Sequence, residues 1–254
     1  MENRTIRCVW EHNGDDTLLY AVDYIGAYAR GENLEAAKEK MVDEISAYLK
    51  WRDEGTSANE FIENTEVETV RAEFAGIEIV QEKSCDLQIK DADSDVIFEE
   101  EKQPLSMEEY LQLKELALKS AKDFLKLYEA IPDKNKSALP KRVTFYGEVP
   151  RTAQEMYEHT KNVNAYYFAE IDVDADNEGD IYQCRKRGFE KLERKEEFLM
   201  NPVIEGSYGE EWSLRKVMRR FVWHDRIHAK AMHRMAEKTF GKDDDVHVNA
   251  FKFI

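Results

Sequence analysis

Short apolar runs alternate with polar residues through the first hundred positions, and this pattern predicts a small β-sheet. The expected strands cover residues 6–11, 18–24, 26–30, 77–82, 86–90 and 95–100. Asn13-Gly14 lies between the first two strands and is a hairpin signal. We expect 86–90 and 95–100 to form a second hairpin. Residues 53–70 show no clear period, and a short second helix is one alternative there.

One segment of this half, residues 32–51, has the period of a helix. Its apolar side chains recur every three or four residues, so they would share one helix face. They are Leu34, Ala37, Met41, Val42, Ile45 and Leu49. Asn33 stands where an N-cap is expected. The pattern therefore predicts a helix that lays one face on a sheet.

The second half has a helical period almost throughout. The expected helices cover residues 106–131, 150–171, 179–200 and 213–240. Ser106 and Thr152 each precede a glutamate by three residues, which is the spacing of a capping box. We expect Gly188 to interrupt the third helix, Ser213 to cap the fourth and Gly241 to end it. Four helices of this length suit a four-helix bundle.

The charge balance differs between the halves. Of 37 basic and 53 acidic residues, 11 basic and 26 acidic lie in 1–104, which leaves 26 and 27 for the rest. We therefore expect an α+β protein with two domains, 1–103 and 104–242, and a tail at 243–254 that is extended or loose. Nucleic acid is not expected as a partner, because phosphate affinity comes from positive charge.

The sequence also bears on the cellular location of the protein. No apolar run approaches the roughly 20 residues that a transmembrane helix needs, so no membrane partner is expected. MENRTIRCVW at the start lacks the apolar block of a signal peptide. Cys8, Cys85 and Cys184 are odd in number and far apart, and they form no CxxC pair. A cytoplasmic location is the simplest interpretation.

The candidate chemistry lies in the sequence WHDRIH at 223–228. His224 and His228 fall on the apolar stripe of the last helix, one turn apart, so both rings point to the same side. His159 falls on the apolar face of the second helix. Three neutral imidazoles on two facing helices suit Zn²⁺ or Ni²⁺ and leave at least one coordination position open. The alternative is that each ring is a core histidine with its own hydrogen bond.

Other residues near these histidines are weaker candidates. Glu158 and Asp225 each adjoin a histidine in sequence and could support a ligand, or they could be solvated carboxylates. Tyr157, Tyr166 and Tyr167 could line a pocket, or they could be core aromatics of the second helix.

Residues 106–240 resemble the DinB-like superfamily of four-helix-bundle metalloproteins. The resemblance rests on TAQEMYEHTKNVNAYY in the second helix and WSLRKVMRRFVWHDRIHAKAM in the fourth. It implies that His159, His224 and His228 bind a divalent metal, often zinc or nickel, and that the chemistry is that of a thiol-cofactor transferase or isomerase. Relatives often follow the last histidine with Arg-Gly-Gln, whereas this chain has Ala229-Lys230-Ala231.

The N-terminal half resembles the HicB-like domain, the small β-α-β module of antitoxin-type proteins. The resemblance rests on the first strand pair and on IGAYARGENLEAAKEKMVDEI, and it implies a partner-binding module. Proteins of that type commonly add a DNA-binding element, but here a helical bundle follows.

Two hypotheses result for the function. One is a metal-dependent enzyme that acts on a small-molecule thiol or as a hydrolase. The other is a non-catalytic protein that binds a protein partner through its N-terminal domain and has a structural or vestigial metal. The sequence leaves open whether the protein forms a homodimer.

Overall fold

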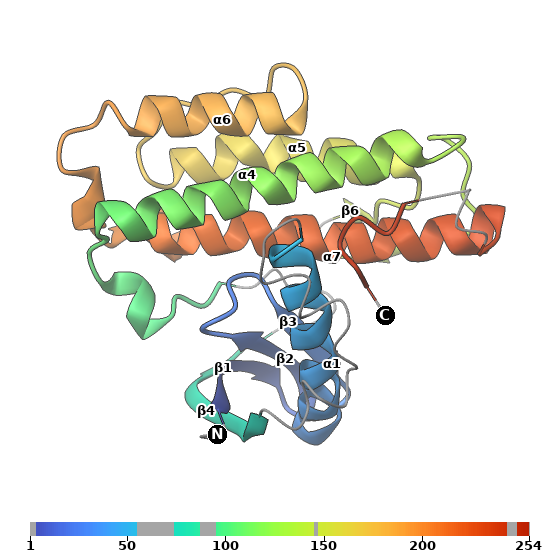
Figure 1. The fold of residues 1–254 in the computed structure, drawn as a ribbon, viewed down its shortest axis with the longest axis horizontal. Helices are drawn as coiled ribbons and strands as arrows, with labels where there is room; N and C mark the ends of the chain where they lie inside the picture. The colour runs from blue at the N-terminus through green and yellow to red at the C-terminus, as the bar shows by residue number, and fades with distance from the viewer. Residues whose placement is uncertain (1–3, 55–73, 87–94, 145–146, 243–247, 254) are drawn as a thin grey trace. The chain divides into compact units, whose positions relative to one another are not determined.

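A computed structural model of the chain describes residues 4–54, 74–86, 95–144, 147–242 and 248–253. The chain divides into two compact units (Figure 1). The N-terminal unit comprises residues 1–98 with 251–254, and the helical unit comprises 99–250. The first is a sheet with a helix and the second is mainly helical, which confirms the predicted α+β class.

The N-terminal unit is built on a four-stranded mixed sheet of order β3-β2-β1-β4. The strands are β1 (Arg4–Asn13), β2 (Asp16–Ala21), β3 (Tyr28–Gly31) and β4 (Phe74–Ser84). The first three pair antiparallel in sequence order, and Gly14 takes the positive φ of +59° that the first hairpin turn requires. β4 returns to pair parallel with β1.

Helix α1 (Leu34–Arg52) follows β3 in the chain and packs on β2 and β3. Its N-cap is the predicted Asn33, whose side chain accepts a hydrogen bond from the Ala36 backbone N–H at 2.9 Å. Ala37, Met41 and Ile45 are fully buried on the sheet side, so the predicted apolar face is confirmed. At the chain's other end, the Phe251 ring stacks on Trp51 of α1 with centroids 5.2 Å apart.

The predicted strand at 95–100 is wrong. Residues 95–98 have no regular structure, and Glu99–Lys102 form a short 3₁₀-helix, η1. Val96, Ile97 and Phe98 are nevertheless buried, and the Ile97 carbonyl accepts a hydrogen bond from the Gln81 side chain at 2.9 Å. The apolar character of residues 96–98 therefore reflects their burial and not pairing in a sheet. Most of its expected partner at 86–90, and most of 53–70, lie outside the described residues.

The helical unit contains α4 (Met107–Ala130), α5 (Ala153–Ala169), α6 (Ile181–Leu192) and α7 (Leu214–Phe240). α4 and α5 each pack on both α6 and α7, so the helices form a bundle (Figure 1). Both predicted capping boxes are present, at Ser106 and Thr152. Ser213 caps α7, and Gly241 ends it with a φ of +108°. Two-residue strands form small pairs in the connections, β5 (Val143–Thr144) with β6 (Gly147–Glu148) and β7 (Ile204–Glu205) with β8 (Glu211–Trp212).

The third helix differs from the prediction in two ways. α6 ends at Leu192, and turns lead to the 3₁₀-helices η2 (Phe198–Met200) and, later, η3 (Ser207–Gly209). Residues 193–197 are exposed, so they give the helix no apolar face to bury. Gly188 does not interrupt α6. A Cβ there would collide with the Phe168 ring, so glycine permits the close contact between α5 and α6.

Among the described residues, no helix combines the length and the apolar character needed to cross a membrane.

Candidate metal centre

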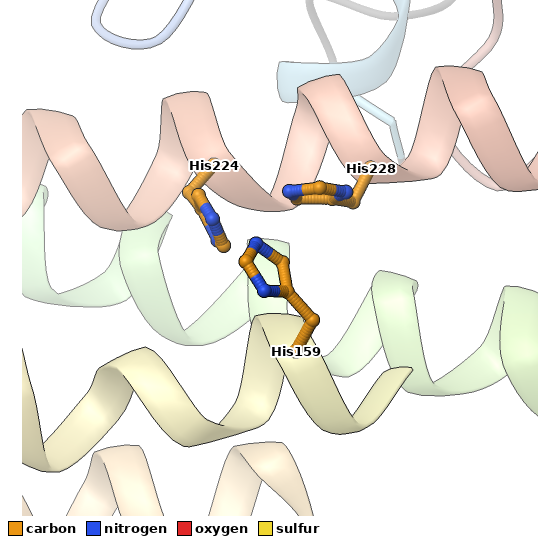
Figure 2. A group of neighbouring side chains, drawn as sticks. All are labelled: His159, His224 and His228. Atoms are coloured by element: carbon orange, nitrogen blue, oxygen red, sulfur yellow. The ribbon is translucent and has the colours of Figure 1, made fainter. Parts of the chain in front are cut away.

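Three histidines of the helical unit converge from two helices (Figure 2). His224 and His228 lie one turn apart on α7, and His159 approaches them from α5. The ring centroids are 4.4 Å apart for His224 and His228, 4.6 Å for His159 and His228, and 5.1 Å for His159 and His224. One ring nitrogen from each histidine lies within 4.8 Å of the other two. The cluster could hold a metal ion.

The three imidazoles differ in exposure. His224 is 5% exposed, His228 is half-buried and His159 is exposed. The cluster therefore has a buried side at His224 and reaches solvent at His159. A metal ion bound here would meet solvent on one side.

The surroundings of His224 favour the neutral form of its imidazole. Burial lowers its pKa well below 6.5, and the neighbouring His228 and His159 lower it further. The Nδ1 atom of His224 is buried and has no hydrogen-bond partner among the described residues. A neutral imidazole is the form that binds metal ions, and coordination satisfies a buried ring nitrogen. Three nitrogen donors of this kind fit a bound metal ion.

Aromatic packing holds α5 against α7 beside the cluster. The Tyr167 ring contacts the edge of His224 at 6.0 Å between centroids and also contacts Phe221 at 5.4 Å. Tyr166 lies against Trp212 at 6.0 Å, and Tyr157 accepts a hydrogen bond from the Ile181 backbone N–H at 3.1 Å. Of these tyrosines, Tyr167 is the one packed on a candidate ligand.

The two carboxylates considered as supports have other partners. Asp225 is buried and forms a bidentate ion pair with Arg185 of α6. Glu158 pairs with Lys161 at 3.2 Å and accepts a hydrogen bond from Gln154 at 3.2 Å. Each side chain points about 100° away from its neighbouring histidine because adjacent helical residues are separated by that angle.

A second cluster of ligand-type residues has no signature in the sequence. Glu11, Cys85 and Asp95 in the N-terminal unit also place their ligand atoms within 4.8 Å of one another. Their separation along the chain hides this arrangement, because it depends on the parallel pairing of β1 with β4.

Comparison with known proteins finds no match to this chain among protein-family models, curated proteins or solved structures.

Proposed function

We propose that the helical unit is a metal-dependent enzyme whose divalent ion, Zn²⁺ or Ni²⁺, is held by His159, His224 and His228. The observation that carries this proposal is the convergence of three ring nitrogens within 4.8 Å from two separate helices. Two histidines one turn apart with a third from a facing helix present nitrogen donors to a common point.

Two features favour catalysis over a structural role, namely the convergence of three ligands in the described part of the chain and the exposure of His159. Structural zinc sites normally have four protein ligands, whereas catalytic sites have three and an open position. His159, on the solvent side of the cluster, gives a substrate a route to that position. A divalent ion in this setting supplies Lewis-acid activation of a water molecule or a thiol.

The chain's residues would hold the ion and keep its ligands neutral. The buried environment of His224 keeps that imidazole unprotonated at neutral pH. Tyr167 packs on the edge of the His224 ring and in turn contacts Phe221, which supports the position of the ring on α7.

We further propose a small-molecule thiol as the substrate class, with transfer or isomerisation of a thiol-linked group as the reaction and hydrolysis as the second candidate. The support for this choice is the resemblance of residues 106–240 to the DinB-like superfamily, carried by the His159 and His224–His228 positions.

A cobalt-substituted protein tests whether the metal has an open position. Co²⁺ would be added to a Cys85→Ser variant, which leaves histidine as the expected ligand, and its visible spectrum would be recorded before and after addition of 2-mercaptoethanol. We expect the spectrum to change on thiol addition, and we expect His228→Ala in the same background to lose the Co²⁺ signal.

A Co²⁺ spectrum that is present but indifferent to thiol would favour the second hypothesis, a non-catalytic protein with a structural metal and a partner-binding N-terminal unit. The absence of any histidine-dependent Co²⁺ signal would rule out the metal centre altogether.

A further inference from the structure

A second group of metal-ligating side chains lies in the N-terminal unit, apart from the three histidines. Glu11 comes from β1, Cys85 directly follows β4, and Asp95 begins the segment that leads into η1. A carboxylate oxygen of Glu11, the Cys85 sulfur and a carboxylate oxygen of Asp95 lie within 4.8 Å of one another. Two oxygens and a sulfur at this spacing can converge on one ion.

The backbone fixes Cys85 in this position. Its N–H donates to the His12 carbonyl at 2.7 Å, which continues the pairing of β4 with β1 past the end of the strand. Its carbonyl accepts a hydrogen bond from the Asn13 side chain at 2.7 Å. The thiol is thereby held beside Glu11, and it donates to the Glu11 Oε1 atom at 3.3 Å.

Asp95 is also held in place, by the segment that follows it. Phe98 is buried against Tyr20 with ring centroids 5.6 Å apart, and the Ile97 carbonyl is hydrogen-bonded by Gln81. The Asp95 side chain is 45% exposed, so the group is open to solvent on that side. Lys83 approaches Asp95 from outside at 4.0 Å.

Glu11 supplies the independent indication that a cation belongs here. Its carboxylate is 1% exposed, and its hydrogen-bond donors are the neutral Tyr20 hydroxyl at 3.0 Å and the neutral Cys85 thiol. No basic side chain of the described residues lies within 4.0 Å of Glu11. Buried carboxylates are normally paired with a cation or bound to a metal, and within the described ranges neither a lysine nor an arginine takes that role for Glu11.

We propose that Glu11, Cys85 and Asp95 form a second metal site, distinct from the three-histidine cluster, for a zinc-type divalent cation. A thiolate ligand excludes Mg²⁺ and Ca²⁺, which take oxygen ligands, and favours Zn²⁺ or its probe Co²⁺. The remaining coordination position would lie on the half-exposed Asp95 side.

Metal binding at this site requires the Cys85 thiol to lose its proton. Burial and the neighbouring Glu11 raise the pKa of the Cys85 thiol to about 12, so the sulfur carries its proton at neutral pH in the metal-free protein. The sulfur–hydrogen bond breaks, the proton goes to solvent, and a sulfur–metal bond forms without any change of oxidation state.

The test is a Co²⁺ titration of the full chain followed by near-ultraviolet absorption, since a thiolate ligand to Co²⁺ gives a charge-transfer band there and histidine ligands do not. We expect the wild-type band to vanish in Cys85→Ser and to persist in His224→Ala and in the control Cys184→Ser. We expect Asp95→Asn, at a half-exposed position, to raise the Co²⁺ dissociation constant for this band at least tenfold.

A wild-type protein without the band would overturn the proposal, as would a band that survives Cys85→Ser or is indifferent to Asp95→Asn. Because the His224→Ala variant retains the second site, its band also separates the fate of this proposal from that of the three-histidine centre.

Discussion

Arg185 of α6 donates to both carboxylate oxygens of Asp225 on α7, at 2.5 and 3.0 Å, and both side chains are fully buried. Arg185 also donates to the Ala117 carbonyl of α4 at 3.2 Å, so one guanidinium links three helices. Asp225 follows His224 directly in the chain. The ion pair therefore fixes the rotation of α7 at the point where its histidines face α5.

Removing the charge of Asp225 should destabilise the helical unit strongly. We expect Asp225→Asn to lower the free energy of unfolding by about 3–5 kcal/mol, because Arg185 would remain buried without its counter-charge. Urea denaturation followed by circular dichroism measures this change. Glu190→Gln is the control, since Glu190 pairs with Lys186 on the exposed face of α6 at 3.9 Å and should matter by less than about 1 kcal/mol. Equal effects of the two substitutions would contradict the role of the buried pair.

The metal-free protein should lose stability in mild acid through His224. The folded-state pKa of His224 lies below 6.5, so the unfolded chain takes up its proton first as the pH falls. Above pH 6.5 both states are neutral at this residue and it contributes no pH dependence. Below 6.5 it should lower the free energy of unfolding by up to about 1.4 kcal/mol per pH unit.

The comparison for this effect is His224→Gln, which keeps a polar side chain of similar size and has no titratable group. Unfolding curves of both proteins between pH 7 and pH 5, in the presence of a chelator, give the two slopes. Parallel slopes would show that His224 is not held neutral by its surroundings.

Gly188 should tolerate no side chain. In an open helix position, Gly→Ala stabilises by up to about 1 kcal/mol, but here the added methyl group meets the Phe168 ring. We therefore expect Gly188→Ala to destabilise the protein by about 1–3 kcal/mol. Thermal unfolding gives the sign directly. Phe168→Leu in the same chain should recover part of the loss, and a more stable Gly188→Ala variant would refute the close contact.

Local signals explain what the sequence predicted well. A cap is formed by residues no more than three positions apart, so the sequence alone predicts the starts of the helices capped by Ser106, Thr152 and Ser213. The convergence of His159 with His224 and His228 followed from helical spacing and from the need of a bundle to bury one stripe of each helix.

Features that depend on tertiary packing were not predictable in the same way. The apolar character of Val96, Ile97 and Phe98 predicts a strand, yet these residues are buried without pairing in a sheet. A glycine within a helical pattern suggests an interruption, and the actual reason for Gly188, its contact with Phe168, lies on another helix and is not visible in the local sequence. The cluster of Glu11, Cys85 and Asp95 likewise depends on strand pairing between distant parts of the chain.

Metal content by mass spectrometry tests the three-histidine centre itself. Wild-type and His224→Ala proteins would be purified without immobilised-metal columns and equilibrated with equal Zn²⁺ or Ni²⁺. We expect His224→Ala to bind one equivalent less metal than the wild-type chain while its circular dichroism spectrum stays the same. Equal metal content in the two folded proteins would contradict it.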